Sequence, residues 1–230
     1  MGLDLSPIVS VTLQNAVLSA TSNLLAQALT SYRSETPFVV DWVPVVQFII
    51  FTFINTPPNF MWQDFLEQTF PGYHAAPTDA AVEKAARSDD KALDSAKGPE
   101  LVEPKLNIRN TLIKTVLDQT VGAAINTLLF SIFMNSLKAA MARPAGLDAP
   151  EQSVAFLFSR AAIDYSRVDW AQIAERTKAE FFPLIAAGWR LWPAVSLINF
   201  ACIKTVEGRN LLGGLAGVGW GIYVSLFAAE

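Results

Sequence analysis

Polar side chains recur at every fourth residue in two long apolar segments of this sequence. The first row is Asn15, Ser19, Asn23 and Gln27, and the second is Asn110, Lys114, Asp118, Gly122 and Asn126. Residues four apart lie on one side of an α-helix. Polar groups are costly in a membrane, so they usually face other helices or water. The first row therefore predicts either hydrogen bonds between helices or one wall of a water-filled path, and both interpretations stay open.

Asp118 brings a negative charge to the edge of residues 119–137, a segment without charged residues. A carboxylate near a membrane core is costly unless it is paired or hydrated. Lys114 and Arg209 are the candidate partners for a structural ion pair. The alternative is that Asp118 faces an aqueous path and favours cations there. Further candidates for polar side chains inside the membrane are Gln119, Asn199 and Arg209.

Residues suited to enzymatic or metal chemistry are scarce. The single cysteine, Cys202, lies in an apolar run, which predicts a buried, inert thiol. The single histidine, His74, begins a polar stretch. No P-loop, paired-cysteine zinc motif, dinucleotide fingerprint or Ser/His/Asp set is present. We therefore expect neither an enzyme nor a cofactor or metal site, and the net charge of −4 gives no reason to expect nucleic acid binding.

The elements that would position these residues are apolar helices. Hydrophobic residues make up 52% of the 230 residues, charged residues 17%, and the mean hydropathy is +0.32. The segments without charge that are long enough to cross a hydrocarbon core of ~30 Å are Ile8–Tyr32, Trp42–Gln63, Gln119–Leu137 and Leu211–Ala229. A fifth run, Phe181–Ile203, is interrupted by Arg190 alone. The sequence predicts an all-α integral membrane bundle of four to five apolar helices, forming one domain over residues 1–230.

Four local signals refine this prediction. Pro57 and Pro58 remove backbone donors, so we expect them to kink or break the second helix. Asp169 is placed to cap a short amphipathic helix. The segment Gly72–Lys105 is rich in Ala, Asp, Glu, Lys, Pro and Ser, and predicts a flexible loop outside the membrane. In the last helix, small residues that allow close packing recur at Gly213, Gly217, Gly221 and Ser225.

The C-terminal stretch from Trp189 to Ser225 resembles the signature of the 22-kDa peroxisomal membrane protein family. The residues that match are Trp189, Trp192, Pro193, Asn199, Phe200, Arg209, Trp220, Tyr223 and Ser225. Ser196 replaces the family's Gln, and Lys204 replaces its second Pro. Pro57, Trp62, Leu66 and Glu67 match a second family motif, and the pair Asp118-Gln119 matches a third.

This resemblance implies a compact helical bundle in the peroxisomal or mitochondrial inner membrane that forms a pore for small solutes. The competing expectation is a membrane organiser or sorting protein that conducts nothing. The partners implied are the lipid bilayer, small solutes and, as a further candidate, a second copy of the chain. No Lys or Arg precedes Arg33, so a basic presequence is not expected. This favours the peroxisome and keeps the mitochondrial inner membrane as the alternative.

Overall fold

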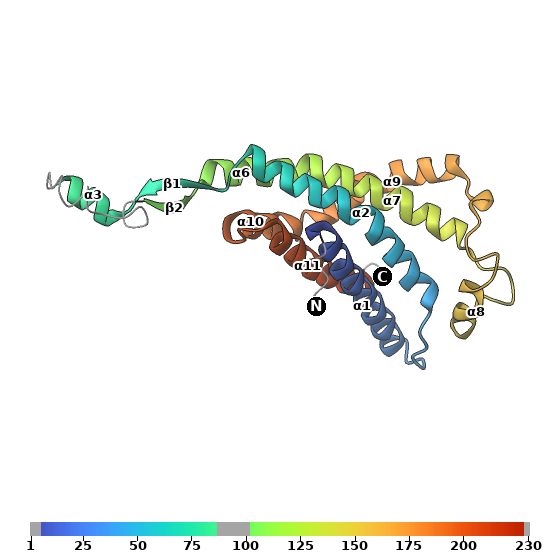
Figure 1. Ribbon diagram of the computed structural model, residues 1–230. Helices are drawn as coiled ribbons and strands as arrows, with labels where there is room; N and C mark the ends of the chain where they lie inside the picture. Colours follow the sequence, from blue (N-terminus) through green and yellow to red (C-terminus); the bar gives the residue numbers. More distant parts are fainter. Residues whose placement is uncertain (1–5, 87–101, 228–230) are drawn as a thin grey trace.

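A computed structural model describes residues 6–86 and 102–227, with the side-chain surroundings of Lys84 and of residues 223–227 left out. The chain is mostly helical (Figure 1). Its long helices are α1 (Pro7–Arg33), α2 (Trp42–Thr69), α6 (Ile108–Leu117), α7 (Ala123–Ala140), α9 (Trp170–Gly188), α10 (Trp192–Cys202) and α11 (Val206–Phe227). The shorter elements are β1 (Tyr73–Pro77), α3 (Asp79–Ala86), β2 (Val102–Leu106), η1 (Asp118–Gly122), η2 (Pro150–Gln152), α8 (Ser153–Leu157) and η3 (Tyr165–Arg167).

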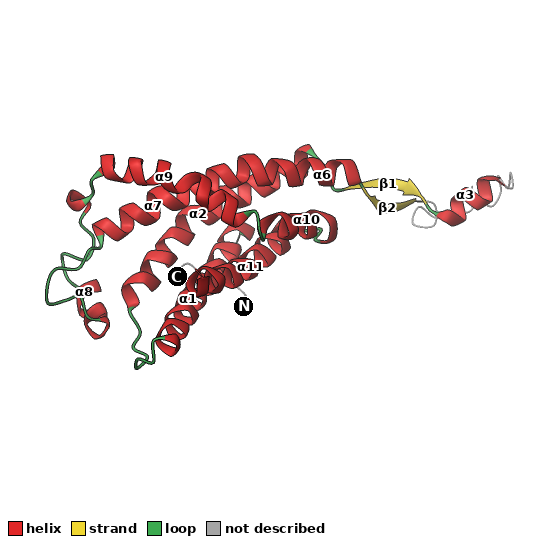
Figure 2. Ribbon diagram, turned by 180° about the vertical axis from the view of Figure 1, so that it is seen from behind, coloured by secondary structure: helices red, strands yellow, loops and turns green. Residues whose placement is uncertain are grey.

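The helices form two packed groups that share α2. Helix α1 packs between α2 and α11, while α7 packs against α2 and α9 (Figures 1 and 2). Helix α10 lies against α6. The π-helical turn η1 joins α6 and α7 into one rod over residues 108–140. The predicted third helix is therefore confirmed, with Asn107 as its N-cap.

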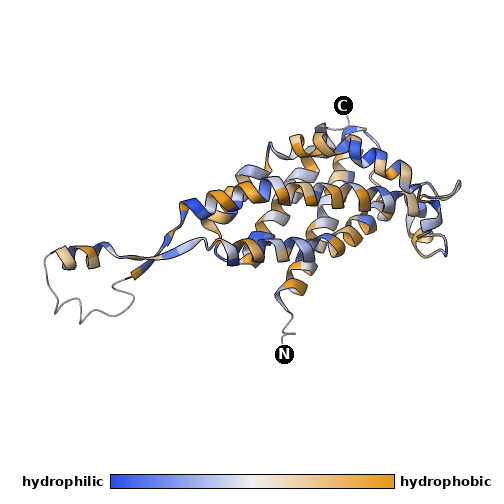
Figure 3. Cartoon of the chain, turned by 90° about the horizontal axis from the view of Figure 1, so that it is seen from above, coloured by the Kyte–Doolittle hydropathy of each residue, from blue (hydrophilic) through white to orange (hydrophobic). Residues whose placement is uncertain are grey.

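The outside of the bundle is apolar, as a bilayer requires. Large exposed side chains include Val17, Met61, Val116 and Phe182, and apolar residues run along the bundle helices (Figure 3). Among the described residues, α1 and residues 108–140 are long and apolar enough to cross a membrane. Helices α9 and α10, which meet at a bend of 57°, would add a third span if they count as one. The predicted count of four to five spans is not confirmed.

Helix α2 stays continuous through Pro57 and Pro58, so the break that we considered does not occur. Asp41 is the N-cap of this helix, and its carboxylate accepts the backbone N–H of Val43. The helix buries several polar side chains, namely Gln47, Thr52, Thr56 and Gln63. Helix α2 therefore turns a polar side toward the interior of the bundle.

The segment predicted as a loop contains regular structure. Strands β1 and β2 pair antiparallel, from Tyr73 opposite Leu106 to Pro77 opposite Val102, and α3 follows β1. Residues 87–101 lie outside the described residues. The hairpin and α3 form an arm that projects away from the bundle (Figure 1). Backbone pairing between the two strands supplies this order, which their low apolar content does not, and a flexible loop outside the membrane stays a prediction for the segment.

The capping signal at Asp169 is confirmed. Its carboxylate accepts the backbone N–H groups of Ala171 and Gln172 at the start of α9. This helix is longer than the short amphipathic helix predicted, since it continues along α7 through Gly188.

Candidate functional site

Four helix ends meet where the arm leaves the bundle, and they bring together Glu67, Lys114, Phe200 and Arg209. We call these four residues the root cluster. Glu67 Oε2 lies 2.7 Å from Lys114 Nζ and 2.6 Å from Arg209 Nη1. Both cations lie over the Phe200 ring, Lys114 Nζ at 5.0 Å and Arg209 Cζ at 5.3 Å from its centre. The exposed fractions are 0% for Lys114 and 1% for Arg209, so one carboxylate serves two fully buried cations.

Backbone groups fix the root cluster at the base of the arm. Glu67 Oε1 accepts the N–H of Gly72, and the carbonyl of Gly72 accepts the N–H of Asn107. A Cβ at Gly72 would lie 3.0 Å from Lys114 Nζ. A larger residue at position 72 would therefore require the ammonium group to shift by a few tenths of an ångström.

Asp118 lies one turn deeper and binds neutral donors from α2. Its Oδ1 accepts Trp62 Nε1 at 3.2 Å and Gln63 Nε2 at 2.9 Å. Its Oδ2 accepts Gln119 Nε2 at 3.1 Å. The prediction of an ion pair with Lys114 or Arg209 was wrong, because Glu67 holds both of those cations.

The π-turn η1 makes room for this arrangement. A Cβ at Gly122 would lie 2.8 Å from Trp62 Nε1, so the indole ring fits only because residue 122 lacks a side chain. On another side of the turn, Trp189 Nε1 donates to the carbonyl oxygen of Gln119 at 3.1 Å. π-Turns inside α-helices are rare and frequently occur at functional sites. Here two tryptophans of the motifs quoted above meet the Asp118-Gln119 pair.

A chain of amides continues deeper between three helices. Asn126 Nδ2 on α7 donates to Asn59 Oδ1 on α2 at 3.5 Å, and Asn59 Nδ2 donates to Asn210 Oδ1 on α11 at 3.2 Å. Asn55, Asn59 and Asn126 also line a pocket of about 350 Å³ that is otherwise largely apolar. Asn55 Oδ1 is buried and has no hydrogen-bond partner among the described residues.

Two polar rows therefore face each other across the bundle, and we call them together the polar seam. The seam consists of Asn55, Asn59, Gln63 and Glu67 on α2, and of Lys114, Asp118, Gly122 and Asn126 on α6, η1 and α7. Glu67 meets Lys114, Gln63 meets Asp118, and Asn59 meets Asn126. Sequence reasoning found the second row and missed the first, although its four-residue spacing was visible.

The polar residues of α1 serve two different purposes. Asn15 Nδ2 donates to Thr56 Oγ1 at 3.4 Å, toward the interior. Gln27 instead holds the start of α2, since its side chain bonds both the N–H and the carbonyl of Asp41 and also Asn23 Oδ1. Asn23 and Gln27 thus act in a clasp between α1 and α2, away from the seam.

The predicted row of small residues in α11 meets α1 at one described position. A Cβ at Gly221 would lie 2.5 Å from Ser22 Oγ, whereas Cβ atoms at Gly213 and Gly217 would have open space within the described residues. Gly214, which was not part of the predicted row, is a second close approach to α1, because a Cβ there would lie 2.6 Å from Asn15 Oδ1. Ser225 and Tyr223 belong to α11, but their side chains lie outside the description.

The other signature residues shape the turns around α10. Trp192 lies beside Gly188 at the bend, and Pro193 is in the first turn of α10. Asn199 is buried and donates from Nδ2 to the carbonyl of Arg209 at 3.3 Å. Trp220 is on α11. Cys202 is exposed, so the prediction of a buried thiol was wrong; the apolar run ends with α10 at this residue.

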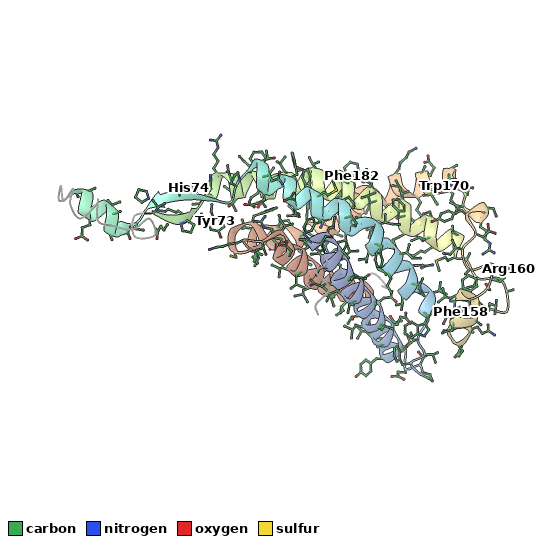
Figure 4. All side chains as sticks on the ribbon, in the orientation of Figure 1. Tyr73, His74, Phe158, Arg160, Trp170 and Phe182 are labelled. Atoms are coloured by element: carbon green, nitrogen blue, oxygen red, sulfur yellow. The ribbon has the colours of Figure 1, made fainter. Side chains whose placement is uncertain are left out.

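Aromatic residues lie at both ends of the molecule (Figure 4). Tyr73 and His74 are on the arm, with the Tyr73 hydroxyl donating to the carbonyl of Ala201 at 3.0 Å. At the opposite end, Phe158 is 90% exposed and Trp170 stacks on Tyr165.

No cluster of His, Cys, Asp and Glu suited to a metal ion occurs in the described part of the chain.

Comparison with known proteins finds one family. Residues 166–225 match the model of the Mpv17 / PMP22 family. The chain is 41% identical to PXMP2/4 family protein 3 of Dictyostelium discoideum over 51 residues, which make up 22% of this chain and 27% of that protein. It is 32% identical to Protein SYM1 of Gibberella zeae over 77 residues, 34% of this chain and 41% of that protein. The matched stretches thus span less than half of either relative, and no solved structure matches.

Proposed function

Because the chain belongs to the Mpv17 / PMP22 family of membrane proteins, we propose that it is a multi-spanning organelle membrane protein that forms a pore for small solutes. The polar seam is the observation that carries this proposal. It places hydrogen-bonding groups along the inside of a bundle whose outside is apolar. Such groups can replace the water around a small polar solute, which a purely apolar interior cannot do.

The weak contacts of the seam would allow a path to open between α2 and α7. Its contacts below the root cluster are single hydrogen bonds of 2.9 to 3.5 Å between uncharged groups or with Asp118. Each such bond contributes only about 1 kcal/mol net between uncharged groups and about 1.5–3 kcal/mol with the Asp118 carboxylate, and water or a polar solute can replace it. The pocket beside Asn55 and Asn126 already provides space at that depth.

Conductance of the purified chain in planar bilayers tests the proposal. We expect channels for small solutes in the wild type, and a reduced conductance in Asn126→Leu, which places an apolar side chain in the seam. Asn135→Leu is the matched control, because Asn135 lies on the same helix but bonds Ser131 and Glu180. A wild-type protein that inserts and never conducts, or equal conductance of the two variants, contradicts this function.

The family membership gives an integral membrane location in the peroxisome or the mitochondrion. We propose the peroxisomal membrane as the first of the two. Fractionation of cells that express the tagged chain decides between them, and co-purification with mitochondrial inner-membrane markers would select the alternative.

A second candidate function follows from the projecting arm. An element that extends away from the bundle (Figure 1) can present strands to other proteins, as a non-conducting organiser or sorting protein would require. Failure to conduct, together with loss of cellular partners when the arm is removed, would favour this role over the pore.

A further inference from the structure

The root cluster holds more positive than negative charge. Lys114 and Arg209 are buried and share Glu67 as their acidic partner among the described residues. Two cations and one carboxylate leave a surplus of one positive charge. Burying an uncompensated charge costs several kcal/mol, of order 3–5 kcal/mol when one partner of a buried pair is missing.

Hydrogen-bond donors remain unused beside the surplus charge. Arg209 Nη1 makes the ion pair without an aligned hydrogen bond, and Nη2 has no hydrogen-bond partner in the described part of the chain. Lys114 has three donors, of which one serves Glu67. The Phe200 ring stabilises positive charge and supplies no negative partner.

A second arginine shows what full compensation looks like in this protein. Arg143 Nη1 and Nη2 both donate to the carboxylate of Asp41, at 3.3 and 2.6 Å, and Nη1 also donates to the carbonyl of Ala149. That pair is neutral, and both terminal nitrogens of Arg143 donate hydrogen bonds. Arg209 lacks such an arrangement although it is the more deeply buried of the two.

We propose that the root cluster binds a small inorganic anion between Arg209 and Lys114. With the anion present, Lys114 keeps Glu67 and Arg209 gains a partner of its own, so the charges of the root cluster and its anion sum to zero. A water molecule would satisfy the donors but leave the surplus charge. Glu67 is 27% exposed and is the member of the cluster that reaches the surface, so the anion enters along its edge. A lipid headgroup is too large for a site whose cations are 0% and 1% exposed.

Deprotonation of Lys114 is the competing way to neutralise the cluster. The short bond to Glu67 and the position over an aromatic ring both favour the charged ammonium form. The two possibilities differ in a measurable way, because only a bound anion makes the stability depend on the anion concentration.

The test compares thermal unfolding of the full chain in detergent with chloride exchanged for gluconate, at constant sodium concentration and ionic strength. We expect the melting temperature of the wild type to rise with chloride. At a chloride concentration ten times the Kd, the ratio of folded to unfolded protein should increase about elevenfold. Arg209→Gln leaves the neutral Glu67–Lys114 pair and should lose the chloride response.

Two further variants keep the test decisive. Lys114→Gln leaves the neutral Glu67–Arg209 pair, so it should also lose the response, and it replaces Arg209→Gln if that variant does not fold. Arg143→Gln removes the compensated arginine and should keep the response. Equal melting of the wild type in chloride and gluconate, or an unchanged response in both cluster variants, overturns the proposal.

Discussion

At the residue scale, a substitution of Asp118 can distinguish a structural role of this carboxylate from a role in conduction. It accepts three hydrogen bonds from neutral donors on α2 and its own turn. An asparagine at this position keeps one acceptor oxygen for Trp62 and Gln63, so Asp118→Asn should fold. Because the change removes the negative charge of Asp118 from the seam, we expect the channel to lose preference for cations. Reversal potentials in asymmetric salt measure this, and unchanged selectivity in a well-folded variant would exclude Asp118 from the path.

Glu67 is the residue on which the root cluster depends most. Glu67→Gln removes the carboxylate that neutralises two buried cations. Such a loss typically lowers the free energy of unfolding by ~3–5 kcal/mol. We expect a value near the lower end, because Glu67 is 27% exposed and water screens part of its interaction. Thermal or denaturant unfolding would show the loss. Asp64→Asn is the control, since that carboxylate lies one turn earlier in an exposed hydrogen bond with Gln68, and a similar loss in the control would refute the special role of Glu67.

At the scale of elements, substitutions in α11 can distinguish the packing of this helix within the chain from its packing against a second copy. Gly214→Leu should lower the melting temperature, because its side chain would enter the space of Asn15 and Leu18 on α1. Gly219→Leu should leave it unchanged, because a Cβ there meets no atom of the described residues within 4 Å. Equal stability of the two variants would contradict the packing of α1 on α11.

Gly217→Leu gives separate information from the same helix. Its surroundings within the described residues are open, so the isolated fold should tolerate the change. Loss of a larger species in size-exclusion chromatography would then identify this side of α11 as a contact with a second copy. An unchanged elution volume would indicate that Gly213 and Gly217 face lipid and not a second copy.

The sequence predicted the helices better than their contacts. The four-residue row through Asp118 and the cap at Asp169 depend on local spacing, and the structure has both elements. The pairing of Glu67 with Lys114 and with Arg209 depends on residues 47 and 142 positions apart and on the meeting of four helix ends. The hairpin was missed for a related reason, since Tyr73 and Leu106, which pair at its base, are 33 positions apart in the sequence.

At the scale of the whole molecule, the bundle and the arm should be separable. Contacts at the base of the arm involve Gly72, Tyr73 and Asn107, and these stay if residues 78–101 are replaced by Asn-Gly between Pro77 and Val102. We expect this variant to resist alkaline carbonate extraction and to melt as the full chain does. Release from the membrane, or a large drop in melting temperature, would show that the arm is required for the bundle.

The π-turn η1 also determines how the chain tolerates a change in length. Residues four apart on a regular α-helix drift by about 40° at each step, since each residue turns by ~100°. The wider turn at Asp118–Gly122 takes up part of that drift and keeps Lys114 and Asn126 directed at the same side of α2. Deleting one residue inside it would restore a regular helix with little rotation of the part after Ala123, because the eleven steps then left between Lys114 and Asn126 turn by ~1100°, about 20° beyond three full turns. Asn126 would still face Asn59, whereas deletion of Ala124 from the regular helix would turn Asn126 about 100° away, although no residue of the seam had been replaced.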